Sequence, residues 1–298
     1  MKKSFGGVDG EAVELYTLRH AADGGIEVDI ITLGATVVSL RAPDVSSVLG
    51  EVTLGFDEAT PYRDGTSPYF GTVPGRCANR IAKGRCIIDG KPLTLATNNA
   101  PNHLHGGDVG FDKRLWKAVA ASPSSLTLEL TSPDGEEGYP GCLTATVTYS
   151  LPTPTSLRIE YGATTDAPTV CNLSNHAYFN LRDGGVTPVL AHEIEIAADH
   201  YTPVDATSIP LGEVRAVSGA MDLRTRGAIG AMIGSADNGN GYDHNWCVSG
   251  PLGDDGLRAV ARVYEPVSGR WMTARSDQPG AAPRQAQARA WAQVQRCQ

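Results

Sequence analysis

The feature that most constrains the fold is an alternation of apolar and polar residues that recurs in short segments along the chain. Successive side chains of a β-strand point to opposite faces of a sheet, so this alternation predicts strands with one buried face. Asp-Gly turn signals separate the segments, for example at Asp89 and at Ser132–Gly135. The alternation is clearest in Ile26–Ile30, Leu126–Leu130, Leu143–Tyr149, Leu157–Tyr161 and Glu193–Ile196.

Helical periodicity is weak by comparison. No segment before residue 280 keeps a helical repeat for more than about three turns. The 34 glycines and 19 prolines among 298 residues exceed average usage and favour many turns over a helical bundle. No internal repeat and no linker divides the chain. The sequence therefore predicts an all-β domain over residues 1–280, built as one large antiparallel β-sandwich.

The net charge of −8 disfavours nucleic acid and anionic membrane surfaces as partners, because both require a basic face. No apolar run approaches the roughly 20 residues of a membrane span. The N-terminal residues lack the apolar stretch of a signal peptide. The 6 cysteines are scattered, which favours reduced thiols over a secreted disulfide framework. We expect a soluble cytoplasmic protein without nucleic-acid or membrane partners.

Short polar clusters rich in Gly, Asn, His and aromatic residues interrupt the alternation. Such side chains suit a neutral polyhydroxylated ligand: directed hydrogen bonds fix its hydroxyls, a ring covers its apolar face, and histidine transfers protons near neutral pH. The common motifs for nucleotide binding, serine hydrolysis and zinc proteolysis are absent. The clusters are Gly75–Ile81, Asn102–Asp112, Asn172–Asn180, Gly241–Asn245 and Gln278–Gly280.

The histidines also have structural interpretations. His103 and His105 would face the same way in a strand and so imitate a metal-binding pair. No third ligand follows at a useful spacing, so we expect no metal. His176, flanked by Asn and aromatic residues, would by default be a hydrogen-bonded core histidine.

The charged residues have structural interpretations as well. Asp243 precedes His-Asn and would cap a turn. Arg80 would form an ion pair with an acid of the 134–137 loop. We expect Glu136 and Glu137 to be structural, because the Pro-Asp-Gly and Tyr-Pro-Gly around them make a turn.

Taken in order, these clusters resemble the aldose 1-epimerase (galactose mutarotase) family from about Val28 to Gly280. Each motif alone is weak, whereas their joint order is highly specific. The motifs are Tyr69–Gly71, Gly75-Arg76, Asn79–Ile81, Leu104–Gly107, Gly110–Lys113 with Trp116, Ser132–Gly141, Asn175-His176, Tyr178–Asn180, Thr202–Asp205, Ile209–Glu213 and Gly241–His244.

The resemblance implies a galactose mutarotase-like supersandwich with a sugar-binding cleft. It also implies interconversion of the α and β anomers of free hexoses, glucose or galactose, without a cofactor. A carboxylate takes the proton of the anomeric hydroxyl while a histidine protonates the ring oxygen. Carried over position by position, His176 is the acid and His105 its helper, and the sugar hydroxyls are bound by Asn79, Arg80, Asp243 and Gln278. We expect a monomer or weak dimer.

The resemblance ends after Gly280, where residues 281–298 form an Ala/Gln/Arg-rich tail outside the family pattern. In the family a later Glu is the catalytic base, whereas this sequence has no Glu or Asp after Asp277. We therefore expect a sandwich that is incomplete at its C-terminal end, a tail that is a short helix or frayed, and little or no epimerase activity. The tail's composition suggests an out-of-frame or alternatively spliced product.

Two alternatives remain open at this point. In the first alternative, which the missing Glu favours, the chain is a catalytically inactive sugar-binding pseudoenzyme or a truncated product. In the second, it is a different carbohydrate enzyme, a lyase or hydrolase, on the same fold. Hydrolysis needs two carboxylates about a glycosidic bond, and only Asp243 lies in a convincing site motif.

Overall fold

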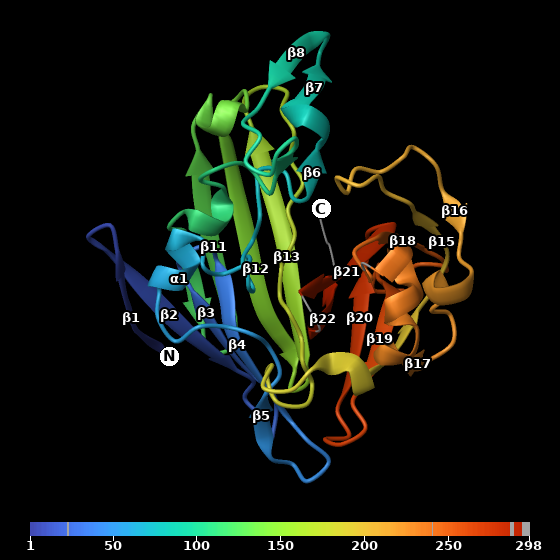
Figure 1. Ribbon diagram of the computed structural model, residues 1–298. Coiled ribbons are helices and arrows are strands. Elements are labelled where there is room, and N and C mark those ends of the chain that lie inside the picture. The colour runs from blue at the N-terminus through green and yellow to red at the C-terminus, as the bar shows by residue number, and fades with distance from the viewer. Residues whose placement is uncertain (23, 240, 287–288, 294–298) are drawn as a thin grey trace.

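The computed structural model describes residues 1–22, 24–239, 241–286 and 289–293. Strands dominate, and the α-helices within the described part are short: α1 (Thr60–Asp64) and α2 (Ile229–Met232). The all-β prediction is confirmed (Figure 1). No helix in the described part is long and apolar enough to cross a bilayer.

The N-terminal half of the fold consists of two antiparallel sheets. The first has the order β1-β2-β3-β4-β5 and the second β10-β11-β12-β13, so neighbours in sequence are neighbours in space. The first is built from β1 (Lys2–Val8), β2 (Glu11–Arg19), β3 (Glu27–Ile31), β4 (Thr36–Pro43) and β5 (Leu49–Glu51). The second is built from β10 (Lys117–Ser122), β11 (Ser125–Ser132), β12 (Leu143–Thr153) and β13 (Ser156–Thr165).

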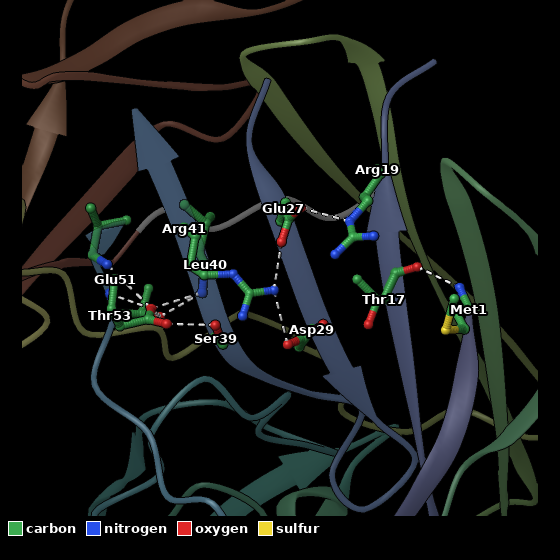
Figure 2. A network of polar contacts seen from close by, with 11 residues as sticks. Met1, Thr17, Arg19, Glu27, Asp29, Ser39, Leu40, Arg41, Glu51 and Thr53 are labelled. Atoms are coloured by element: carbon green, nitrogen blue, oxygen red, sulfur yellow. Dashed lines mark hydrogen bonds and ion pairs between the residues drawn. The ribbon is translucent and has the colours of Figure 1, made fainter. Parts of the chain in front are cut away.

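The alternation predicted from sequence appears directly in these strands. Along β12 every second residue, from Leu143 to Leu151, is buried, and its neighbours are half-buried. On β3 and β4 the polar positions pair across strands on one face, where Arg41 forms ion pairs with Glu27 and Asp29 at 2.9 and 3.2 Å. Figure 2 shows these pairs, and Glu27 also reaches Arg19. One face of the sheet is therefore apolar, and part of the other face carries cross-strand ion pairs.

Two further sheets form the C-terminal half, on the other side of the view in Figure 1. One has the order β17-β14-β19-β20 and the other β16-β15-β18-β21-β22. The strands of the first are β14 (Glu193–Ile196), β17 (Gly227–Ala228), β19 (Arg258–Tyr264) and β20 (Trp271–Ser276). The strands of the second are β15 (Ala198–Thr202), β16 (Arg215–Ala216), β18 (Asn245–Val248), β21 (Gly280–Ala286) and β22 (Arg289–Gln293).

Short pairs and single turns complete the fold. The pairs are β6 (Arg80–Ile81) with β9 (His103–Leu104), and β7 (Arg85–Ile88) with β8 (Lys91–Thr94). The 3₁₀ turns are η1 (Ala82–Gly84), η2 (Phe111–Lys113), η3 (Glu136–Gly138), η4 (Val189–Ala191), η5 (Gly219–Met221) and η6 (Ile233–Gly239).

The main hydrophobic core is shared by all four larger sheets. It contains Tyr16 of β2, Leu128 of β11, Ile194 of β14 and Trp246 of β18 in one continuous cluster of buried side chains. A smaller cluster on the other face of the N-terminal sheet packs beneath α1, around Tyr62. This layered arrangement of sheets over a common core agrees with the predicted sandwich.

The segment after Gly280 differs from the expectation of a helix or a frayed end. Residues 280–286 and 289–293 are strands, and β21 pairs with β18 through Trp246↔Ala281 and Cys247↔Gly280. Strand pairing uses main-chain groups, so an Ala/Gln-rich composition does not prevent it, and the edge of β18 is thereby covered. Residues 287–288 and 294–298 of the tail lie outside the described residues.

Candidate active site

Three predicted site residues meet at the small β6–β9 pair. Arg80 of β6 lies opposite Leu104 of β9, directly beside His105. The amide of His105 donates to the carbonyl oxygen of Asn79 at 3.0 Å. The Nε of Arg80 donates to Oδ1 of Asn99 at 3.2 Å, so a neighbouring loop orients this guanidinium. Asn79, Arg80 and His105 therefore belong to one backbone framework.

The turn after His105 depends on two glycines. A Cβ on Gly106 would lie 1.6 Å from the carbonyl oxygen of Gly75, and one on Gly107 would lie 2.0 Å from a carboxylate oxygen of Glu137. Both glycines also have positive φ, at 96° and 113°. Only glycine fits positions that combine this backbone conformation with such close approach, and the Gly-Gly pair after His105 marks this turn in the sequence.

Hydrogen bonds from two loops support the same turn. The side chain of Asn98 accepts from the amide of Leu104 and donates to the carbonyl oxygens of Leu104 and Gly107, all at 2.8–2.9 Å. The carboxylate of Glu137 accepts from the amides of Asp108 and Val109 at 3.0 and 2.9 Å. These contacts agree with the structural interpretation of Glu137.

Glu136 has the same kind of role. Its carboxylate accepts a hydrogen bond from Ser132 Oγ and forms an ion pair with Arg114. Arg76, which is 1% exposed, donates to the carbonyl oxygens of Ser132 and Pro133 at 2.8 Å each, in the same turn. The residues around this acidic pair therefore hold the turn together.

One tautomer of His105 is defined by its surroundings. The ring is 1% exposed, and its Nδ1 accepts a hydrogen bond from the amide of Asn79 at 2.9 Å. A nitrogen that accepts carries no proton, so the neutral ring has its proton on Nε2. His105 is therefore fixed as a hydrogen-bond donor through Nε2.

His176 lies beside His105, brought there by a different segment of the chain. Its ring is 2% exposed, and the two imidazoles meet edge to face with centroids 5.1 Å apart. Backbone hydrogen bonds from Gly71 to His176 and from His176 to Thr72, at 3.1 and 2.9 Å, attach this segment to residues 71–72. Asn175 Nδ2 adds a bond to the Gly71 carbonyl oxygen at 3.0 Å. The structure thus joins the two histidines that the sequence analysis singled out.

The aromatic rings of Tyr69 and Tyr178 surround this pair, and neither is among the site residues predicted from the sequence. The ring of Tyr69 lies 4.5 Å from that of His105 and 5.6 Å from that of His176, measured between centroids. Tyr178 packs against His176 at 5.1 Å. The only sequence signal for Tyr69 is its place at the start of the motif Tyr69–Gly71.

His103 has a structural role in the fold. Its Nδ1 lies 2.8 Å from the Ala96 carbonyl oxygen and its Nε2 lies 2.6 Å from the Tyr139 hydroxyl, so both ring nitrogens are engaged. Burial lowers the pKa of this imidazole. The φ of His105 is 51°, so the chain leaves the strand conformation there and the expected parallel orientation of the two rings does not follow.

Asp243 and Gln278, the other two predicted binding residues, lie in the C-terminal half of the chain. Asp243 is exposed and lies two residues before β18, while Gln278 is half-buried and lies two residues before β21. β18 and β21 pair antiparallel, so the segments that precede them lie at opposite ends of the pair, and Val248 of β18 donates to the Pro279 carbonyl oxygen at 2.8 Å. The loops of the two halves meet where Asn102 Nδ2 donates to the Thr207 carbonyl oxygen at 3.2 Å.

The chemistry available at this site is acid catalysis on a polar, uncharged ligand. Two buried imidazoles in contact supply a proton donor of fixed tautomer and a second titratable ring. Arg80 and Asn79 beside them are hydrogen-bond donors suited to hydroxyl oxygens. Within the described ranges, no group of three or more His, Cys, Asp or Glu is arranged to hold a metal ion.

Comparison with known proteins identifies relatives over most of the chain. A sequence model of the family described as aldose 1-epimerase matches residues 14–283. The galactose mutarotase of Bos taurus is 44% identical over 256 residues, which are 86% of this chain and 73% of the relative. The aldose 1-epimerase of Escherichia coli K12 is 38% identical over 260 residues, with the same shares of the two chains.

Solved structures give the same result for the fold. A GalM/aldose epimerase homologue from C. elegans aligns with a TM-score of 0.83 and 26% identity, covering 94% of this chain and 89% of that one. A galactose 1-epimerase from Lactobacillus acidophilus aligns with a TM-score of 0.76 and 26% identity, covering 89% and 76%. The predicted galactose mutarotase-like fold is therefore confirmed.

Proposed function

The chain belongs to the aldose 1-epimerase family, and on that premise we propose that it interconverts the α and β anomers of free hexoses such as glucose and galactose. The observation that carries the proposal is the edge-to-face contact of His105 and His176 at 5.1 Å, with Arg80 and Asn79 attached to the same framework. Acid catalysis of ring opening needs a proton donor beside the ring oxygen, and this pair supplies one.

The reaction assigns a separate task to each histidine. In the family a carboxylate base, which the C-terminal segment of a relative supplies, takes the proton of the anomeric hydroxyl, the C1–O5 bond breaks, and its electron pair goes to O5. His176 gives O5 a proton, and His105 donates a hydrogen bond through Nε2 to the same region. The aldehyde rotates about the C1–C2 bond, and the reverse steps close the ring on its other face. All atoms and electrons are conserved, and no cofactor takes part.

Substrate binding is assigned to four residues. Asn79 and Arg80 on the N-terminal side and Asp243 and Gln278 on the C-terminal side hold the sugar hydroxyls. We expect weak binding, because each hydrogen bond to the sugar replaces one to water. A free hexose is the proposed partner. A monomeric or weakly dimeric state and a cytoplasmic location remain proposals, which sedimentation and cell fractionation test.

Polarimetry on freshly dissolved α-glucose or α-galactose tests the activity. The assay compares the 298-residue chain with a chimaera in which the C-terminal segment of a mutarotase relative follows Gly280. We expect the chimaera to accelerate mutarotation, and His176→Asn in it to lower kcat by about 10²–10⁴-fold with little change in KM. His20→Asn, at a half-buried histidine far from the site in sequence, is the matched control. Unchanged turnover in the His176 variant would place the acid elsewhere.

A binding-only function is the second candidate, favoured by the lack of Glu and Asp after Asp277. It predicts that the 298-residue chain binds hexose in a calorimeter yet leaves mutarotation at its uncatalysed rate. If this chain instead matches the chimaera, its own residues include the base and the binding-only candidate is wrong. Asp243→Ala in either background should weaken binding, and unchanged binding would contradict the site assignment.

A further inference from the structure

The ring of Tyr69 is in contact with both histidines. Its ring centroid lies 4.5 Å from that of His105, at 59° between planes, and 5.6 Å from that of His176, at 40°. The two imidazoles come from segments more than 60 residues apart in sequence, at positions 105 and 176. A ring that touches both fixes their relative placement in a way that neither backbone segment does alone.

The backbone conformation of Tyr69 orients this ring. Its φ is 65°, in the left-handed region that bulky residues avoid. Thr72 keeps the turn closed, donating from its amide and its hydroxyl to the Tyr69 carbonyl oxygen at 3.2 and 3.1 Å. The turn is also attached to the His176 segment through the Gly71–His176 backbone bond. Unfavourable conformations of this kind persist where the surrounding structure imposes them, and they gather at functional sites.

His105 is held from its other side. Its own φ is 51° and that of Asn79 is 64°, so both residues share the left-handed conformation of Tyr69. The Asn79 amide binds Nδ1 at 2.9 Å, and rotation of the ring would break that bond. The ring is also in contact with His176 and Tyr69.

We propose that Tyr69 is a positioning residue, which holds the imidazoles of His105 and His176 in the edge-to-face arrangement that proton transfer to the sugar ring oxygen requires. This inference rests on the proposed function. It predicts that the Tyr69 ring, rather than its hydroxyl, is what catalysis needs. It also predicts that removing the ring affects kcat and leaves hexose affinity almost unchanged.

The kinetic test uses three variants in the background that accelerates mutarotation. Tyr69→Phe keeps the ring and should stay within about threefold of the parent, whereas Tyr69→Leu and Tyr69→Gly should lower kcat by about 10–100-fold, as small misplacements of reacting groups do. KM should change by less than about threefold. A raised KM with unchanged kcat would make Tyr69 a sugar-stacking residue and overturn the proposal.

Tyr69→Gly separates positioning from a loss of folding. Glycine adopts positive φ without steric cost, which offsets part of the packing lost with the ring, so this variant should still unfold cooperatively at a temperature close to that of the parent while losing activity. Ser47→Gly, at another non-glycine residue with positive φ of 61°, makes the same exchange in a distant turn and should leave kcat unchanged. Equal activity of Tyr69→Gly and the parent would contradict the proposal.

A spectroscopic readout keeps the proposal testable even without activity. In ¹⁵N-imidazole correlation spectra, His105 of the 298-residue chain should show one tautomer with its proton on Nε2, and Tyr69→Gly should show a mixture. If neither parent chain nor chimaera accelerates mutarotation, the proposed function fails, and the spectra alone decide the positioning role. A single unchanged His105 tautomer in Tyr69→Gly would then overturn it.

Discussion

At the scale of single residues, the carboxyl group of Asp112 is the clearest case of a side chain held against its ionisation preference. It is 5% exposed, in the segment that follows the His105 turn. Burial raises its pKa from 3.8 to about 6, and the positive charge of Lys113 offsets this only in part. The segment that follows the His105 turn therefore includes a group that titrates in a mildly acidic range.

This shift predicts how stability depends on pH. Between pH 3.8 and about 6 the folded state binds more protons at Asp112 than the unfolded state, so its contribution to stability falls as pH rises through this window. Above the window the loss is complete, about 3 kcal/mol for a shift of roughly two units. Asp112→Asn removes this dependence. In urea unfolding at pH 4 and pH 7.5, the free energy of unfolding of the variant relative to the parent should rise with pH. A pH-independent difference would contradict the assignment.

At the scale of elements, the β9 turn depends on close backbone approach rather than on side-chain packing. Gly106 and Gly90 both have positive φ, at 96° and 75°, yet only Gly106 has backbone atoms where a Cβ would be. The two positions are thus a matched pair that separates steric clash from backbone conformation.

We expect Gly90→Ala to cost about 1–2 kcal/mol, because its only penalty is the left-handed conformation. Gly106→Ala carries the same penalty plus a 1.6 Å approach to the Gly75 carbonyl oxygen, which no rotamer relieves. It should cost over about 4 kcal/mol and abolish hexose binding. Thermal unfolding and calorimetry measure both effects. Equal costs at the two positions would show that the turn adapts to a side chain.

At the scale of the whole molecule, Arg270 joins the C-terminal sheets to the N-terminal half. Its guanidinium, in a residue 7% exposed, donates to the carbonyl oxygens of Ala42 at 3.1 Å, Leu181 at 2.8 Å and Arg182 at 3.1 Å. These acceptors lie far from it in sequence. Arg270 therefore satisfies buried carbonyl groups where the sheets meet.

Removing this guanidinium should destabilise the whole fold. Arg270→Met keeps the side-chain length and leaves the carbonyl oxygens without their donor, for an expected loss of about 3–5 kcal/mol. Arg275→Met is the control, because the exposed pair of Arg275 with Asp255 at 2.6 Å contributes less than about 1 kcal/mol. Denaturant unfolding compares the two. A loss at Arg270 no larger than at Arg275 would contradict the joining role.

The sequence by itself determined the all-β class, the positions of long strands such as β12, and the family. Strand alternation is a local property, because neighbouring side chains of an extended chain always point to opposite faces. The family motifs are likewise runs of adjacent residues. His105, His176, Asn79 and Arg80 were identified in this way, and the structure places them on one framework. How Asp243 and Gln278 bind substrate remains a prediction.

Only the tertiary structure decided how these residues act. The tautomer of His105 depends on an amide 26 positions away, and the contacts of Tyr69 depend on two distant segments. Tyrosine and histidine prefer negative φ, so residue type alone does not predict the left-handed turns that orient their rings. Residues 280–286 form a strand because main-chain groups of β18 pair with it, and amino-acid composition does not predict this pairing. Local rules predict what each segment prefers, and the groups brought beside it by folding decide what it does.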